Sequence, residues 1–527
     1  MLPVTNLSTD IPYLDHVLTS FAQIIFYSGR WAVSFALSAL MGERGNPADC
    51  EFRQVLIRKI IEETQMKTID MRSRCSLTQA LDASKLRRMG LSLTLTVMLL
   101  CGLTVSTSAQ RPAVFETAPA QGFTITPHVQ TPIILKTEPD AACDLHAEGI
   151  SDPSHTLRFY ANGDGYIQVH VTARQESEQG ERVQLDCTAA GKVIRYPLHL
   201  RAASSPTVEM PAPQIIRPTP KGSRVLPALT EEDSQRLSDD DLSRLGYPRR
   251  PDARASRDKY AKWLERVSQP LTLVPSHVVN RSDISHQTRN VEAGTEANAN
   301  WSGFEARGSN RSYMAVTGEW TVPEITTGES GNKTYSSFWV GLDGDGTSDL
   351  VQAGTEQDYV DIWIFNFAEY SAWTELLPNQ PTEQNVSLSP NPGDDIEVEV
   401  WIGADNQGPP NQNGGYGNFR IIDWTQNEES LTATALSGTY FNGKEAEWIM
   451  ERPTVNGTYA ELSAYMVAIM TDASALPTKG PWIDSETVGN QELLMYNEDF
   501  NHPDNDLLSI PSPAGPDVMF FFWANFH

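Results

Sequence analysis

The second half of the chain is a succession of short segments in which apolar and polar residues alternate. Clear examples are Val316–Val322, Ser336–Leu342, Val360–Phe365 and Ile396–Ile402. Clusters of Pro, Gly and Asn separate these segments. A period of two places successive side chains on opposite faces of a β-strand. Because the region shows no helical period, residues 296–527 are predicted to form one large antiparallel β-sandwich.

A smaller set of alternating segments lies upstream, in residues 110–201. Leu157–Tyr160 and Tyr166–Val171 flank a turn sequence, Asn162–Gly165. This pattern predicts a small Ig-like β-sandwich of antiparallel strands. Cys143 and Cys187 are the only cysteines after Ala109. In an exported chain we expect them to form one disulfide, which would link the two sheets.

Residues 202–295 have a different character. Six prolines make residues 202–228 an extended linker. Thr230 is placed to cap an acidic helical stretch, and a second helix is expected after Ser256, with Tyr260 and Trp263 on its apolar face. A polar stretch without strong secondary structure follows, from Asn280 to Asn300. Residues 229–295 therefore read either as a helical pro-segment with a polar linker or as a simple spacer.

An export signal is predicted in residues 89–109. The apolar run Leu91–Val105 follows basic residues and precedes small residues that end at Ala109. Cleavage there would give a secreted or periplasmic protein without stable membrane association, whereas an uncleaved run would anchor the chain. Residues 1–88 are an extension of uncertain meaning, and a mis-assigned start explains them most simply.

The composition restricts the partners. The 527 residues carry a formal net charge of −27, which argues against nucleic acid as a ligand because phosphates require a basic surface. After Arg289 acidic residues far outnumber basic ones. Protonation would relieve their mutual repulsion, so an acidic working environment is one interpretation and a solvated acidic surface is the other. A monomer is expected.

The predicted large sandwich is also poor in the usual catalytic residues. From Glu296 onward there is no cysteine, and His502 and His527 are the only histidines. Most hydrolases use histidine as a base, as the partner of a nucleophile or as a zinc ligand. Catalysis here would have to depend on carboxylates and amides. No motif indicates a metal or another cofactor, and Asp343 and Asp345 lack the spacing of an EF-hand.

Two segments carry candidate carboxylates. Period two places Glu447 and Glu451 on one face of a strand with Trp448 on the other, and it places Trp373 beside Glu375. Acidic residues at a sheet edge would instead serve solubility. Gln352 lies in an apolar run, where its amide would satisfy a backbone group or stabilise an oxyanion. The pattern alone decides neither case.

Five ordered motifs together resemble the glutamic peptidases called eqolisins. They are Asn300–Gly303, Val316–Pro323, Phe338–Gly354, Tyr370–Glu375 with Pro378, and Ala446–Glu451. The resemblance covers about a third of the chain and implies a concanavalin-like sandwich of two antiparallel sheets that binds an extended polypeptide. It implies Gln352 and Glu451 as catalytic residues and no metal. Supporting positions in the cleft would be Glu447, Glu375, Trp339, Trp373, Asp343 and Trp301.

The sequence together with this resemblance therefore predicts a secreted, acid-acting glutamic endopeptidase. A sandwich that binds peptide or glycan through its tryptophans without catalysis is the first alternative. A glycosidase with a pair of carboxylates is the second.

Overall fold

The structure is a computed structural model that describes residues 113–115, 122–150, 155–203, 220–254, 256–287, 297–325, 333–403, 415–436, 441–485, 490–497 and 507–524. The predicted signal and the extension before it lie outside these residues. So does most of the proline-rich linker, although its last part contains β9 (Arg224–Leu226). Within the described residues no helix is long and apolar enough to span a membrane.

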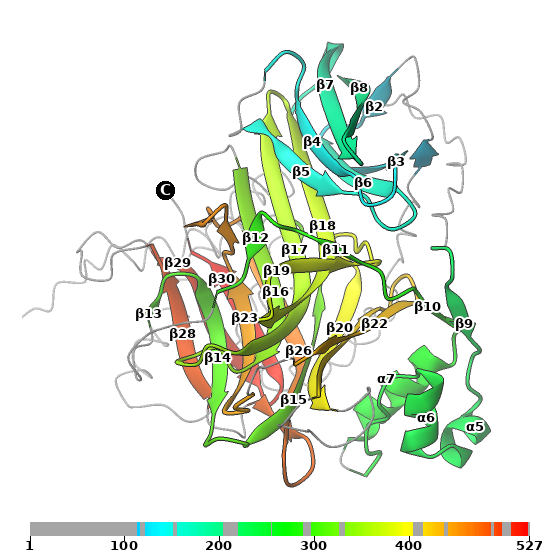
Figure 1. The fold of residues 1–527 in the computed structure, drawn as a ribbon, viewed down its shortest axis with the longest axis vertical. Helices are drawn as coiled ribbons and strands as arrows, with labels where there is room; N and C mark the ends of the chain where they lie inside the picture. The colour runs from blue at the N-terminus through cyan, green and yellow to red at the C-terminus, as the bar shows by residue number, and fades with distance from the viewer. Residues whose placement is uncertain are drawn as a thin grey trace, which may run out of the picture. The chain divides into compact units, whose positions relative to one another are not determined.

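Two large antiparallel sheets form the C-terminal domain (Figure 1). The first sheet contains, in spatial order, β28 (Asn490–Tyr496), β14 (Trp301–Arg307), β23 (Glu445–Glu451), β16 (Lys333–Leu342), β17 (Leu350–Ile362), β18 (Phe365–Leu377) and β19 (Gln380–Val386). The second contains β22 (Glu428–Ala435), β21 (Tyr416–Asp423), β20 (Asp395–Gly403), β15 (Tyr313–Thr321), β26 (Val467–Pro477), β30 (Val518–Trp523) and β29 (Leu507–Gly515). The predicted all-β sandwich is thereby confirmed.

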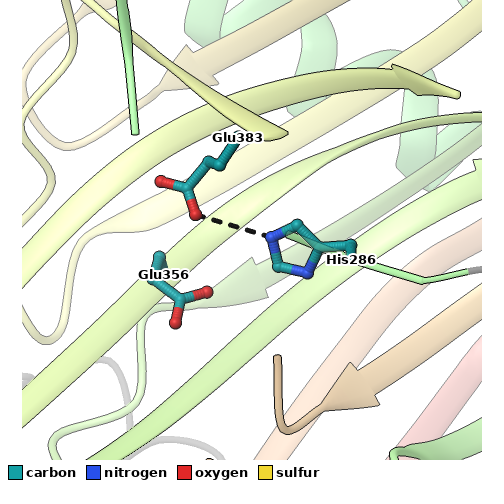
Figure 2. Close-up of side chains that lie close together, drawn as sticks. All are labelled: His286, Glu356 and Glu383. Atoms are coloured by element: carbon teal, nitrogen blue, oxygen red, sulfur yellow. Dashed lines mark ion pairs between the residues drawn. The ribbon is translucent and has the colours of Figure 1, made fainter. Parts of the chain in front are cut away.

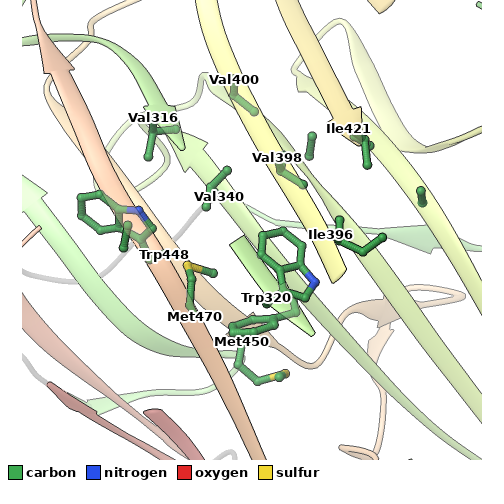
Figure 3. Packing of buried hydrophobic residues seen from close by; sticks show 14 of the residues in the cluster. Val316, Trp320, Val340, Ile396, Val398, Val400, Ile421, Trp448, Met450 and Met470 are labelled. Carbon is green, nitrogen blue, oxygen red and sulfur yellow. The ribbon is translucent and has the colours of Figure 1, made fainter. Parts of the chain in front are cut away.

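The core lies between the two sheets. Trp448 and Met450 of β23 pack with Trp320 of β15 and Val398 of β20 in one buried cluster (Figure 3). Ile449, which lies between them in sequence, belongs to a different cluster with Trp301, Trp339 and Trp373. The period of two predicted for β23 is therefore present, and Glu447 and Glu451 lie on the face of the first sheet that points away from the core.

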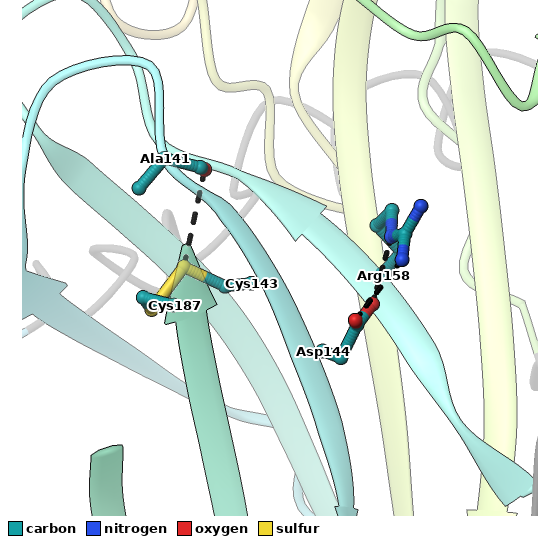
Figure 4. Close-up of a disulfide and its surroundings, with 5 residues drawn as sticks. All are labelled: Ala141, Cys143, Asp144, Arg158 and Cys187. Atoms are coloured by element: carbon teal, nitrogen blue, oxygen red, sulfur yellow. Dashed lines mark hydrogen bonds and ion pairs between the residues drawn. A yellow bond between two sulfur atoms is a disulfide. The ribbon is translucent and has the colours of Figure 1, made fainter. Parts of the chain in front are cut away.

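A five-stranded sheet, β2-β8-β7-β4-β5, forms much of the N-terminal domain. Its strands are β2 (Phe123–Ile125), β8 (Lys192–Ala202), β7 (Ser177–Ala189), β4 (Ala142–Ala147) and β5 (Leu157–Tyr160). The disulfide between Cys143 and Cys187 forms (Figure 4). The two cysteines are register partners on β4 and β7, so the predicted link between sheets is wrong, because the bond joins neighbouring strands of one sheet.

The N-terminal domain is continuous with the large sandwich. β6 (Tyr166–Ala173) pairs with the start of β18 and with β3 (Thr131–Lys136). β3 in turn pairs with β1 (Ala113–Phe115). The tip of the β17–β18 hairpin supplies Val360, Ile362, Phe365 and Phe367 to the N-terminal core. The strand predicted over Val360–Phe365 is wrong, since the chain turns at residues 363–364.

Three helices precede the large sandwich. They are α5 (Glu231–Arg236), capped by Thr230, α6 (Asp239–Leu245), capped by Ser238, and α7 (Arg257–Val267), capped by Ser256. The predicted caps at Thr230 and Ser256 are confirmed. The first helical stretch is divided in two, because Leu237 is extended and Ser238 starts a new capping box.

The chain after α7 contains three short strands, β10 (Leu271–Leu273), β11 (Val278–Asn280) and β12 (Ile284–Ser285). Of these, β12 lies within the stretch Asn280–Asn300 that was predicted to lack strong secondary structure. β11 pairs with β19, and β12 pairs with β24 (Thr454–Val455), which follows β23. β24 also pairs with β25 (Thr458–Tyr459). We call residues 278–286 the covering segment because they run from β19 of the first sheet to β24, across the face that bears Glu451.

Candidate functional site

The register of the first sheet aligns the candidate residues in rows. Gln352 on β17 is opposite Gly341 of β16 and Glu375 of β18. Gly341 is also opposite Glu447 of β23. Since directly opposed residues point to the same face of a sheet, Glu447, Gln352 and Glu375 form one row. A Cβ atom at Gly341 would lie 2.8 Å from the ring of Trp339 and 3.3 Å from Gln352, closer than van der Waals contact allows, so only glycine fits in this row.

Glu451 lies on the same face, two rows further along, beyond the row that contains Ile449 and Trp339. It is opposite Trp301 of β14 and Ser337 of β16, and Ser337 is opposite Glu356 of β17. Glu451 is fully buried. Its Oε1 accepts a hydrogen bond from the side-chain amide of Asn300 at 3.0 Å, and its Oε2 accepts one from the indole N–H of Trp339 at 2.8 Å. Two fixed donors therefore orient this carboxylate.

Glu451 has a third partner that comes from the covering segment. The Nδ1 atom of His286 lies 3.1 Å from Glu451 Oε2. The backbone N–H of His286 donates to Glu375 Oε2 at 3.2 Å. The imidazole is stacked on Trp373, with ring centroids 3.9 Å apart and an interplanar angle of 6°. Burial opposes the charge of His286, but the carboxylates of Glu451, Glu383 and Glu375 prevail and raise its pKa to about 10.

Gln352 joins this network through Glu375. Its Nε2 donates a hydrogen bond to Glu375 Oε2 at 2.8 Å. The amide N–H of Gln352 therefore binds a side chain, whereas an amide in an apolar strand was expected to bind a backbone group or an oxyanion. Burial raises the pKa of Glu375 to about 8, with Glu451 adding to the effect and His286 opposing it. Gln352 and Glu451 are therefore linked through two intermediate groups: Gln352 contacts Glu375, Glu375 contacts the backbone of His286, and the imidazole of His286 contacts Glu451.

The predicted aromatic positions line the same face. Trp301, Trp339 and Trp373 are fully buried and cluster with Ile449. Trp373 donates its indole N–H to Ser337 at 3.0 Å. Asp343 lies elsewhere: its carboxylate accepts from the backbone N–H groups of residues 442–445. In this position Asp343 stabilises a turn and makes no described hydrogen bond to Gln352 or Glu451.

The solubility explanation for Glu447 and Glu451 is wrong. β23 lies between β14 and β16, so it is not an edge strand. Both carboxylates are 0% exposed. Acidic side chains at an exposed edge would be hydrated, whereas these are enclosed on both sides. Their burial is costly unless their surroundings compensate it, which is typical of a functional site.

A second group of charges adjoins this network. Arg281 of the covering segment is 1% exposed and contacts Asp358 at 2.9 Å and Glu369 at 3.3 Å. Glu356 and Glu383 are buried beside His286 (Figure 2). The covering segment thus places two basic side chains, Arg281 and His286, among the carboxylates of β17, β18 and β19.

Sequence reasoning missed His286. The scan for histidine was confined to the large sandwich, whereas His286 precedes it in the chain and reaches the site only through the pairing of β11 and β12. A single histidine in a polar stretch carries no pattern that would have identified it. The one available signal was that residues 278–286 hold Arg281 and His286 directly before a strongly acidic domain.

The buried face of this antiparallel β-sandwich combines glutamates, a glutamine and tryptophans, which is the set expected of a hydrolase that uses carboxylates and amides. Residues 299–494 match the family described as Peptidase A4. The C-terminal domain accordingly belongs to the glutamic peptidases and is a glutamic-type endopeptidase domain.

The chain is similar to aspergillopepsin-2 of Aspergillus niger, with 29% identity over 255 residues that cover 44% of this chain and 79% of that protein. Two solved structures are also similar. Scytalido-glutamic peptidase with a peptide-based transition state analogue shows 19% identity, covers 43% of this chain and 98% of that one, and has a TM-score of 0.33. SCP-B, an eqolisin in complex with the tripeptide Ala-Ile-His, shows 19% identity, the same coverage and a TM-score of 0.32.

Proposed function

We propose that this protein is a secreted, acid-acting endopeptidase in which Glu451 and Gln352 are the catalytic residues. Glu451 as carboxylate takes a proton from the attacking water and returns it to the leaving amine. The Gln352 amide donates to the oxyanion of the tetrahedral intermediate. Glu375 orients the amide or the water. The Peptidase A4 match and the similarity to aspergillopepsin-2 support a polypeptide as the substrate.

One observation carries this proposal. Gln352 and Glu451 come from strands far apart in the sequence, and the register brings both to one buried face, where each is held by a specific side chain: Glu375 for Gln352, and Trp339 for Glu451. A hydrolytic site needs a base and an oxyanion donor that are both fixed before substrate binds. A solely structural sandwich has no need for this arrangement.

The proposed reaction can be tested with purified protein incubated with denatured globin from pH 2 to 7, and in parallel with polysaccharides. We expect globin fragments at acidic pH, undiminished by a metal chelator, and no sugar release. Binding of either polymer without cleavage at any pH would identify a binding domain. Release of reducing sugar would identify a glycosidase.

We further propose that the covering segment keeps the enzyme latent. His286 occupies the hydrogen-bonding positions of Glu451 and Glu375 that a water and a substrate carbonyl would need. The segment is held at both ends, by β11 on β19 and by β12 on β24. Substrate can enter only when this segment leaves the face. Residues 229–295 would then be a pro-segment. Within it, the covering segment is the part that blocks the site.

The latency proposal predicts that His286→Ala increases the initial rate of globin cleavage by the unprocessed full chain, by about tenfold or more, because it removes a charge-assisted contact with Glu451. His277→Ala is the matched control: His277 is half-exposed and contacts Asp140, away from the face. The full chain is preferable to a chain starting near Thr295, since truncation would uncover Phe365 and Phe367. Equal rates for the wild type and His286→Ala would exclude the latency role.

A further inference from the structure

His286, Glu356 and Glu383 form a buried cluster whose polar atoms are incompletely satisfied. The three side chains are at most 1% exposed. The Nε2 atom of His286 and all four carboxylate oxygens of the two glutamates have no hydrogen-bond partner among the described residues. Within the cluster, His286 Nε2 and Glu383 Oε2 form an ion pair of 3.5 Å. Figure 2 shows the three side chains close together, with the ion pair between His286 and Glu383 as a dashed line.

The neighbouring cation does not compensate these two glutamates by direct contact. Arg281 directs its guanidinium to Asp358 and Glu369. Burying two adjacent carboxylates is unfavourable unless a cation or bound protons balance them. Above the acidic range the charged imidazole of His286 is shared between Glu383 and Glu451. One carboxylate of the cluster is then left uncompensated, and a divalent ion that replaces the imidazole proton would balance it.

The geometry is close to that of a metal site. One ligand atom from each residue lies within 4.8 Å of the others. A tetrahedral zinc ion with bonds of about 2.0–2.2 Å holds its ligand atoms about 3.3–3.6 Å apart. The His286–Glu383 separation of 3.5 Å already meets this spacing. Only Glu356 must move inward, by rotation of its side chain.

The surroundings of His286 also match those of a metal-bound histidine. Such a histidine usually donates its second ring N–H to a carboxylate, which fixes the tautomer and the ring orientation. Here Nδ1 faces Glu451 Oε2 at 3.1 Å. The stacked indole of Trp373 fixes the plane of the ring. Nε2 is therefore directed toward Glu356 and Glu383.

We propose that His286, Glu356 and Glu383 bind one divalent transition-metal ion of the zinc type, which ties the covering segment to β17 and β19. One imidazole nitrogen with two carboxylates suits zinc, whereas magnesium and calcium prefer ligand sets made of oxygen alone. The ion adds regulation to the proposed latency, but its binding does not require Glu451 or Gln352 to be catalytic. Acid releases it, because protons compete for the same ligand atoms.

The proposal is tested by calorimetric titration of the chelator-treated full chain with zinc chloride at pH 7. Other histidines can bind zinc weakly, so the comparison with variants decides whether the tightest site is the proposed cluster. We expect Glu356→Gln and Glu383→Gln each to weaken the tightest site at least about tenfold. Glu447→Gln is the matched control, because it removes a buried carboxylate from the same sheet face outside the cluster and should leave zinc affinity unchanged.

Cobalt(II) provides a second readout that does not depend on activity. A four-coordinate ion in the wild-type site should give strong visible absorption that zinc displaces and that Glu383→Gln lowers. Thermal melts check that each variant folds. If the variants do not fold, the wild-type spectrum decides, and the weak absorption of a six-coordinate ion would overturn the site. Absence of zinc binding by the wild type, or unchanged affinity in both folded glutamine variants, would also overturn it.

Discussion

Glu451→Gln should lower kcat/KM for globin by about 10³-fold or more, since a glutamine cannot accept the proton of the attacking water. Gln352→Ala should lower it by about 10²–10³-fold through loss of the oxyanion donor. Both changes are best made in the full chain that carries His286→Ala, so that latency does not mask the effect. Initial rates at acidic pH measure the change.

The control for this result is Glu447→Gln. Glu447 is equally buried and lies on the same face, in the row of Gln352. Glu447→Gln should lower kcat/KM less than Glu451→Gln does if Glu447 only supports the site. A larger loss with Glu447→Gln would mean that the catalytic carboxylate has been assigned to the wrong end of β23. A melting temperature close to that of the parent chain is required of each variant, so that lost activity is not lost structure.

The melting temperature should fall by about 10 °C or more between pH 4 and pH 8. The second sheet and its loops contain buried carboxyl groups that ionise with difficulty. Asp394 and Asp423 accept hydrogen bonds from the same Gln426 amide, at 2.7 and 2.9 Å. Burial, and then the facing Asp394, raise the pKa of Asp423. Burial raises the pKa of Glu429 to about 7, although Arg420 opposes it.

The direction of this change in melting temperature follows from the number of protons that the native and unfolded states bind. In the unfolded chain these carboxyl groups lose their protons near pH 4, whereas in the native state they retain them to higher pH. Between those values the unfolded state binds fewer protons, so the free energy of unfolding decreases as pH rises. The stabilisation is complete below about pH 4 and is lost as pH rises through 7 and 8. An enzyme that works in acid would benefit from this dependence.

Asp394→Asn isolates one contribution to this trend. The variant removes one of two facing carboxyl groups, so it should melt at a higher temperature than the wild type at pH 8 and at nearly the same temperature at pH 4. Calorimetric melts at several pH values measure both. A wild-type melting temperature that is flat or rises from pH 4 to pH 8 would contradict the assignment of protonated buried pairs.

Local pattern was sufficient for much of the fold. The alternation in Glu445–Glu451 correctly separated Trp448 and Met450, which enter the core, from Glu447 and Glu451, which do not. The caps at Thr230 and Ser256 were also readable, because a capping hydroxyl and the N–H it binds are three residues apart. Such features depend on neighbours in sequence, and a sequence displays those directly.

The hydrophobic pattern gave wrong predictions where a segment far away in the sequence buries the side chains. The hairpin tip near residues 363–364 reads as one continuous apolar strand, because Val360, Ile362, Phe365 and Phe367 are all covered by the N-terminal domain. The disulfide was expected from the cysteine count, but whether it joined two sheets or two neighbouring strands depended on the register of β4 and β7.

The candidate site divides in the same way. Residue types, an amide in an apolar run and carboxylates with period two, made Gln352, Glu375, Glu447 and Glu451 candidates. Their roles were implied only by the resemblance to the eqolisins and stay predictions. Only the folded chain brought His286 against Glu451 and between Glu356 and Glu383, since those contacts join residues far apart along the chain through strand pairing. Alternation along one strand assigns a side chain to a face, but which other strand supplies its neighbour is decided by the packing of the whole domain.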